Sequence, residues 1–143
     1  MVIAEAMLAD LPAVPSSASL VEAARLLRKT GSTLLPVRSG GGIIGSVSER
    51  DLALKGCGSG GDPAGIMVAD VMTEDPVMLP GSAPAEVALE LMARTGMTAV
   101  VVHNNDGQIV GVATLAHVLD GLNRPPTEGP IPDSVKRVRG EPL

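Results

Sequence analysis

Apolar residues recur at the i, i+3, i+4, i+7 spacing of an amphipathic helix in two places along the chain. The first set is Leu20, Ala23, Ala24 and Leu27, and the second, 65 residues later, is Ala85, Ala88, Leu89 and Met92. A short extended piece precedes each helix, at residues 12–14 and 76–79, and two short apolar runs follow it. Gly-Gly and Asp-Gly turns at residues 39–42 and 104–107 separate these runs and predict β-hairpins. A second helix is then predicted to start at Ser48 and at Thr114.

The chain aligns with itself when it is shifted by 65 positions. Identical residues meet at many points, among them Met7 and Met72, Asp10 and Asp75, Pro15 and Pro80, Ala23 and Ala88, and Gly31 and Gly96. One extra residue, Gln108, then changes the shift to 66. We therefore predict an α+β fold of two β-α-β-β-α copies, repeat 1 at residues 1–60 and repeat 2 at residues 66–122.

Each copy has about 55 residues, which is too few for a comfortable core of its own, so the copies are expected to pack against each other. Residues 56–63 are rich in Gly and Ser and form a flexible link, whereas residues 123–143 hold five prolines and are predicted to be a disordered tail.

Predicted helix caps agree with the two copies. Ser19 with Glu22 fits a capping box, and Gly31 and Gly96 fit C-cap glycines.

Composition narrows the classes of function. The 143 residues include no Phe, Tyr or Trp, so no base can stack on an aromatic ring, and the net charge of −5 disfavours binding to nucleic acid or to an anionic membrane. The N-terminus lacks a basic region typical of a signal peptide, and no apolar run approaches the ~20 residues that span a bilayer. A single cysteine, Cys57, allows no intrachain disulfide, and the expected location is the cytoplasm.

Motifs for catalysis or for metal binding are missing from the sequence. His103 and His117 do not have the spacing of a metal pair, and there is no HExxH, paired CxxC, P-loop or G-x-S-x-G motif. We therefore assign no catalytic residue, no metal ligand and no cofactor, and do not expect an enzyme.

The segment Gly45–Asp51 offers the best candidate chemistry. Ser48 and Asp51 lie three residues apart at a predicted helix start, which is typical of a simple N-cap. The same carboxylate could instead accept hydrogen bonds from the two vicinal hydroxyls of a ribose, while free backbone N–H groups at the helix end favour a phosphate. The motif alone leaves both interpretations open.

With its duplicated architecture the chain resembles the CBS-domain family, specifically a tandem CBS pair or Bateman module. The resemblance covers residues 1–122 and rests on the paired Met-Pro-Val entries, the Gly31–Val37 segment, the hairpins and the Gly45–Asp51 motif. It implies a pseudo-twofold arrangement with two clefts between the repeats. It also implies a regulatory ligand, AMP, ADP, ATP or S-adenosylmethionine, and a regulated partner protein.

The resemblance further implies the residues of each cleft. The first cleft would use Ser48 and Asp51 for the ribose and Arg50 for phosphate, together with Ser46, Val47, Met72, Val77, Met78, Met97 and Thr98. The second would use Thr114, His117, Met7, Pro12, Ala13, Ser32 and Thr33. Because His117 stands where an acid is expected, and a neutral imidazole has at most one acceptor, we expect this cleft to bind weakly or to stay vacant.

The favoured function is a ligand sensor that modulates a separate, unknown protein. The alternative is a ligand-free interaction or scaffold module of the same fold, in which the Ser48–Asp51 cap is purely structural. By analogy with CBS pairs, a homodimer is expected.

Overall fold

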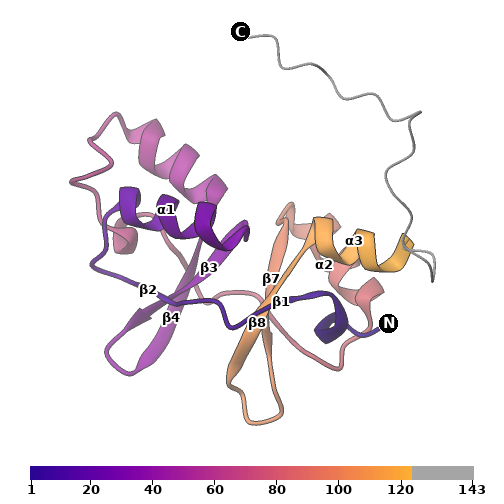
Figure 1. The fold of residues 1–143 in the computed structure, drawn as a ribbon. Helices are drawn as coiled ribbons and strands as arrows, with labels where there is room; N and C mark the ends of the chain where they lie inside the picture. The colour runs from indigo at the N-terminus through magenta and orange to yellow at the C-terminus, as the bar shows by residue number, and fades with distance from the viewer. Residues whose placement is uncertain (124–143) are drawn as a thin grey trace, which may run out of the picture.

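The structure is a computed structural model that describes residues 1–123, so most of the predicted tail at 123–143 lies outside the described residues. Two four-stranded sheets stand side by side, with helices gathered at one end and the two hairpins at the other (Figure 1). Sheet 1 has the strand order β2-β3-β4-β5 and sheet 2 the order β1-β8-β7-β6. The predicted α+β class with two repeats is confirmed.

Sheet 1 is built mainly from the first repeat. Its strands are β2 (Val14–Pro15), β3 (Leu34–Ser39), β4 (Gly42–Ser48) and β5 (Thr73–Glu74), with helix α1 (Leu20–Thr30) and a π-helix η2 (Asp51–Gly56) against them. Strand β2 runs parallel to β3, and β3 pairs with β4 as the predicted antiparallel hairpin. We refer to this sheet with α1 and η2 as the first half.

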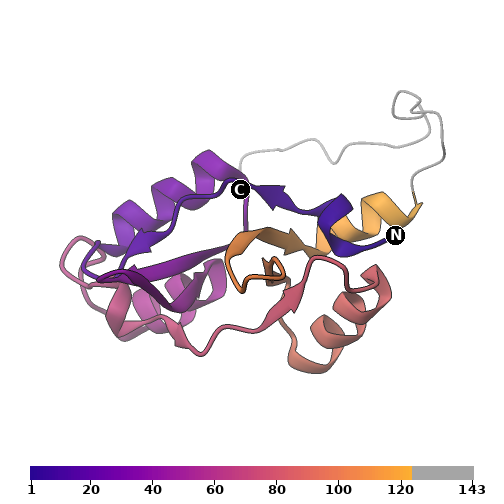
Figure 2. The same ribbon diagram turned by 90° about the horizontal axis from the view of Figure 1, so that it is seen from below.

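Sheet 2 repeats the plan. Its strands are β1 (Leu8–Ala9), β6 (Met78–Pro80), β7 (Ala99–His103) and β8 (Ile109–Thr114), with helices α2 (Ala85–Thr95) and α3 (Leu115–Asn123). Short 3-10 turns η1 (Ile3–Ala6), η3 (Cys57–Ser59) and η4 (Val68–Asp70) complete the described chain. Sheet 2, α2 and α3 form the second half, and a view from below shows α1 and α2 on opposite sides of the molecule (Figure 2).

The predicted N-cap at Ser19 and the two predicted C-cap glycines are present, although only the Ser19 half of the predicted capping box is formed. Ser19 Oγ accepts the Glu22 N–H at 3.2 Å, which fixes the start of α1. Gly31 and Gly96 both have φ of 73° and end α1 and α2 in the left-handed region that glycine adopts without steric cost.

Each repeat places its first segment in the other half, a feature the sequence analysis did not predict. Strand β1 pairs with β8, and β5 pairs with β4. The fully buried Ile3 joins the core of the second half and donates its N–H to Ala83 O, whereas the equivalent Val68 joins the core of the first half and donates to Ala18 O. The halves are therefore tied together by exchanged strands as well as by packing.

The halves meet through a small apolar cluster. Its buried members are Leu34 from β3 and Ala99, Val101 and Val112 from sheet 2. The equivalent residues Thr33 and Thr98 approach each other, with their hydroxyl oxygens 3.5 Å apart. Equivalent residues facing each other in this way mark the pseudo-twofold relation between the repeats.

Candidate functional site

A cavity of about 540 Å³ lies between the two halves. The first half lines it with side chains from β3, β4, β5 and η2, and the second half contributes the end of α2 and the start of β7. The lining residues are Thr33, Leu34, Ser46, Ser48, Glu49, Arg50, Asp51, Ala53, Thr73, Gly96, Met97, Thr98 and Ala99.

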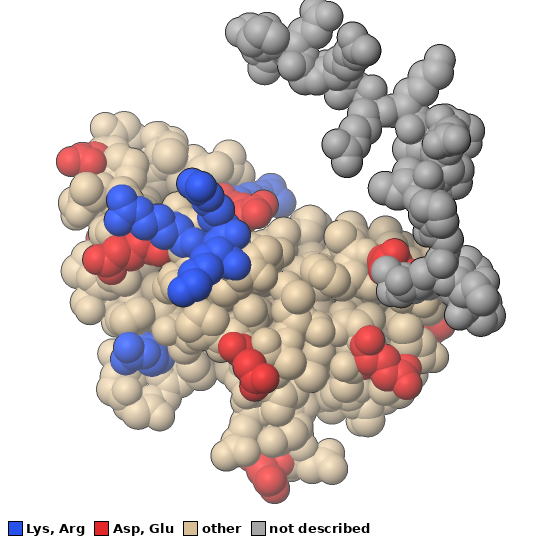
Figure 3. All heavy atoms as spheres, in the orientation of Figure 1, with Lys and Arg blue, Asp and Glu red and all other residues tan. Residues whose placement is uncertain are grey.

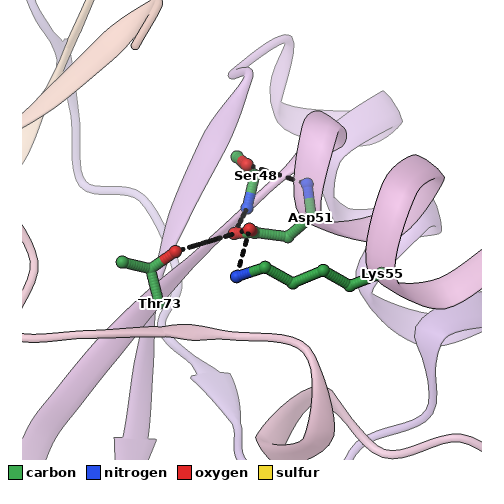
Figure 4. A network of polar contacts seen from close by, with 4 residues as sticks. All are labelled: Ser48, Asp51, Lys55 and Thr73. Atoms are coloured by element: carbon green, nitrogen blue, oxygen red, sulfur yellow. Dashed lines mark hydrogen bonds and ion pairs between the residues drawn. The ribbon is translucent and has the colours of Figure 1, made fainter. Parts of the chain in front are cut away.

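Asp51 is the buried carboxylate of this cavity and is only 7% exposed, whereas the other lining carboxylate, Glu49, is exposed. Its Oδ2 accepts the Ser48 N–H at 3.0 Å, and its own N–H donates to Ser48 Oγ at 3.1 Å (Figure 4). This reciprocal pair of hydrogen bonds is a capping box, with Asp51 in the place usually taken by Glu or Gln. The predicted cap is therefore present, and it fixes the direction of the carboxylate.

Two further groups reach the same carboxylate. Lys55 Nζ lies 3.1 Å from Oδ1, and the hydroxyl of Thr73 lies 3.4 Å from both oxygens (Figure 4). Thr73 comes from β5, the strand that repeat 2 places in sheet 1. A carboxylate has about four acceptor sites, and the long Thr73 contacts are the weakest of those made. A ligand hydroxyl could therefore take the place of Thr73 without disturbing the Ser48 cap.

The opposite wall is mostly apolar. Met97 and Ala99 face the cavity together with Leu34, and the Thr33 and Thr98 hydroxyls lie on the pseudo-twofold axis. Arg50 extends toward this wall, because its Nη1 lies 3.6 Å from the position that a side-chain carbon on Gly96 would take. The cavity thus combines two carboxylates, of which Asp51 is the buried one, with several hydroxyls, an apolar surface and a guanidinium.

Six residues predicted for the first cleft line this cavity: Ser46, Ser48, Arg50, Asp51, Met97 and Thr98. The other four lie elsewhere. Val47 and Met72 pack in the core of the first half, Val77 packs against the core of the second half, and Met78 borders a groove between the hairpins.

The sequence analysis missed Thr73, Leu34, Glu49, Ala53, Gly96 and Ala99 as cavity residues. Thr73 directly follows Met72, but its position beside Asp51 depends on strand exchange, for which the sequence has no local signal. Leu34 and Ala99 could have been found as the chain neighbours of Thr33 and Thr98, which were themselves predicted to line a cleft.

The second half has different side chains at the position equivalent to the Ser48–Asp51 cap, where β8 meets α3. Thr114 Oγ accepts the His117 N–H at 3.2 Å and also bonds the His117 ring nitrogen Nδ1. Leu8 takes the place of Thr73, and Gly121 takes the place of Lys55. The imidazole is exposed, whereas Asp51 is buried, so this corner presents no carboxylate.

The other residues predicted for the second cleft are dispersed. Ser32 is buried and donates to Leu34 O at 2.6 Å, and Met7 packs on the core of the second half. Thr33 lines the first cavity, Ala13 borders the groove between the hairpins, and Pro12 is exposed.

Residues 1–123 contain no group of three or more His, Cys, Asp or Glu side chains placed to hold a metal ion. In the same part of the chain, no helix is both long and apolar enough to cross a membrane.

The sequence-family model of the CBS domain matches the chain twice, at residues 3–55 and 68–124. The chain belongs to the CBS-domain family. Among its relatives is an inosine-5'-monophosphate dehydrogenase of Korarchaeum cryptofilum, 31% identical over 109 residues. That match covers 76% of this chain but only 22% of the dehydrogenase, so the CBS pair corresponds to about a fifth of that protein.

Solved structures agree with this CBS pair. The CBS-pair protein CBSX2 of Arabidopsis thaliana, solved in complex with AMP, is 27% identical, with coverage of 85% of this chain and 95% of that chain and a TM-score of 0.66. A putative signal-transduction protein with CBS domains from Burkholderia ambifaria has a TM-score of 0.80 at 21% identity, with coverage of 89% and 95%, and supports the fold alone.

Proposed function

We propose that this CBS pair is a regulatory ligand sensor that binds an adenine nucleotide or adenosyl compound, AMP, ADP, ATP or S-adenosylmethionine, in the cavity between its halves. The observation that carries the proposal is the buried Asp51 carboxylate, held by Ser48 at the wall of a 540 Å³ cavity whose other wall belongs to the second half. The complex of CBSX2 with AMP supports the choice of ligand class.

Each part of such a ligand has a matching surface. The two ribose hydroxyls would donate to Asp51 and displace the long Thr73 contacts, and hydrogen bonds to a charged acceptor are worth roughly 1.5–3 kcal/mol each. The adenine ring would lie against Met97, Leu34 and Ala99, an aliphatic surface suited to a chain without aromatic residues. Arg50 would meet a phosphate or carboxylate at the mouth of the cavity.

Regulation would follow from the two-sided site. A ligand that contacts both halves favours the arrangement in which they are close, and so shifts the population presented to a partner protein. The cavity holds hydroxyls, two carboxylates and one guanidinium but neither His nor Cys, so we propose binding without catalysis. The residues of the site do not specify the regulated partner.

Isothermal titration calorimetry with AMP, ADP, ATP, adenosine and S-adenosylmethionine tests the proposal, with Asp51→Asn as the decisive variant. Asn keeps a cap oxygen but loses the charge, so we expect the dissociation constant to rise by roughly tenfold or more. His117→Asn, at the equivalent position of the other repeat, is the matched control and should leave the affinity unchanged. If no adenosyl compound binds, or if Asp51→Asn binds as tightly as the wild type, the proposal is wrong.

One observation favours the second candidate, a ligand-free scaffold. The Asp51 oxygens already have protein partners in Ser48, Lys55 and Thr73, as a purely structural cap would require. In that case Asp51→Asn would alter thermal stability without changing the binding of any nucleotide.

A further inference from the structure

An apolar groove of about 530 Å³ lies between the two hairpins. A neighbouring hollow of about 420 Å³ shares Leu11, Pro36 and Ile109 with it, so the two form one trough, which we call the hairpin groove. Most of its side chains are aliphatic, among them Leu11, Pro36, Ile43, Pro76, Met78 and Ile109. No residue of the hairpin groove lines the nucleotide cavity.

Both halves build the hairpin groove from equivalent positions. Leu11 corresponds to Pro76 at a shift of 65 residues, and Ile43 corresponds to Ile109 at a shift of 66. The groove therefore lies along the pseudo-twofold axis. Ile43 in its wall is 40% exposed, so the aliphatic surface is open to solvent, and such surfaces often mark interaction sites.

Three exposed carboxylates surround this aliphatic surface. Asp10 lines the groove, and its equivalent Asp75 directly precedes Pro76 of the lining. Asp106, in the turn of the second hairpin, directly precedes Gly107 of the lining. None of the three carboxylates forms a hydrogen bond or an ion pair with another described residue. In Figure 3 acidic side chains lie at the seam between the halves and on the second hairpin, whereas most basic ones lie over the helices of the first half.

The chain itself contains a segment of matching chemistry. Residues 135–139, which lie outside the described residues, read Val-Lys-Arg-Val-Arg and so combine two aliphatic side chains with three cations. Residues 1–123 hold 13 acidic and 7 basic side chains, a net charge of −6, whereas residues 124–143 hold 3 acidic and 4 basic ones, a net charge of +1. The opposite charges attract the segment to the body of the protein.

The connection to the segment is long enough to reach the groove. Strand β8 has six residues at ~3.3 Å each and α3 has nine at ~1.5 Å each, so Asn123 lies within about 33 Å of Ile109. The eleven residues 124–134 can span about 36–40 Å when extended. Val135 can therefore arrive at the groove of its own chain.

We propose that the hairpin groove receives residues 135–139 of the same chain. The two valines cover the aliphatic surface, and the three cations face the carboxylates of Asp10, Asp75 and Asp106. Each exposed ion pair contributes little by itself. The tether makes the contact intramolecular, so several weak contacts act at a high effective concentration. The inference does not depend on nucleotide binding.

Paramagnetic relaxation enhancement in the full chain tests the proposal. A nitroxide is attached at Gly140→Cys, in a chain that also carries Cys57→Ser so that it holds a single thiol. We expect the amide signals of Gly107, Gln108 and Ile109 to lose intensity relative to the same sample with the nitroxide reduced. High salt should restore these signals, because it screens exposed charges.

Neutralising the two equivalent acids is the decisive variant. Asp10→Asn with Asp75→Asn removes both charges, and Asn tolerates the left-handed backbone that the two aspartates adopt, with φ of 55° and 51°. We expect the signal loss to fall severalfold in this variant. The matched control is Glu22→Gln with Glu86→Gln, which removes two exposed acids on α1 and α2 outside the groove and should preserve the loss. Ile43→Thr, which makes the wall more polar, should also reduce it.

Three results would overturn the inference. These are full intensity at the groove amides in low salt, a signal loss that the Asn pair does not reduce, and a loss that appears only between separately labelled chains. The last result would assign the segment to the groove of a second copy. Because the groove and the nucleotide cavity share no lining residue, AMP titrations of the same samples report the proposed function separately.

Discussion

Asp51 caps a helix and also carries the proposed contact to the ligand. Its capping box with Ser48 holds the carboxylate in one direction, and its burial removes competing water. A ligand hydroxyl therefore meets an acceptor that is already oriented, which reduces the ordering cost of binding. At the residue scale, the helix cap fixes the direction of the carboxylate, and the proposed ribose contact would use the acceptor sites that the cap leaves.

The equivalent residue His117 leads to a stability prediction. It occupies the third position after Thr114 at the start of α3, where a helix favours a negative charge and a carboxylate can accept the Thr114 N–H. We expect His117→Asp to increase the free energy of unfolding by about 0.5–1 kcal/mol. Urea denaturation measures it, with Asn105→Asp, which adds the same charge at an exposed turn, as a control that should change little. A loss of stability would contradict the prediction.

At the scale of elements, two equivalent glycines permit the exchanged strands to approach. A side-chain carbon on Gly45 would lie closer than 3.0 Å to Thr73 O on β5, and one on Gly111 would lie equally close to Leu8 O on β1. The sheets can therefore add their fourth strands only because these positions have no Cβ.

Replacing these glycines separates structural from functional effects. Gly45→Ala should push β5 away from β4, move Thr73 from Asp51, and lower both the stability, by about 1–3 kcal/mol, and the affinity for the nucleotide. Gly111→Ala should lower the stability similarly but leave the affinity unchanged, because β1 is not part of the cavity. Urea denaturation and calorimetry of both variants provide the measurements. Equal losses of affinity in the two variants would be inconsistent with this account.

The helix after the motif also differs between the halves. Asp51 opens the π-helix η2, whereas His117 lies in the ordinary α-helix α3. π-Helical turns are rare in proteins, but those that occur are often found at functional sites. The difference agrees with the assignment of the ligand to the first half.

For the whole molecule, the exchange of first segments makes the two halves interdependent. A fragment of residues 66–143 would lack Ile3 and β1, which would leave a hole in its core and an unpaired edge on β8. A fragment of residues 1–65 would lack Val68 and β5, which would leave a hole in its core and an unpaired edge on β4.

We expect neither of these two fragments to fold alone. Co-expressed, they should assemble and recover cooperative unfolding, because every exchanged contact is then available. Circular dichroism and urea denaturation of each fragment and of the assembled pair provide the test. Cooperative unfolding of residues 66–143 by themselves would show that the exchange is dispensable.

The amino-acid sequence by itself determined the duplicated plan of this protein. The spacing of Leu20, Ala23 and Leu27 predicted α1, the glycine turns predicted the hairpins, and the cap of Ser48 with Asp51 is as expected, because each depends on contacts between residues close in sequence. The resemblance to CBS pairs, which rested on these motifs, indicated six residues that do line the cavity.

Only the tertiary structure decided which residues share a site. Thr73 reaches Asp51 through an exchanged strand, whereas Val47, Met72, Val77 and Met78 lie outside the cavity wall. Strand partners and exposed faces depend on contacts between distant parts of the chain, and a local pattern of residues does not specify those contacts.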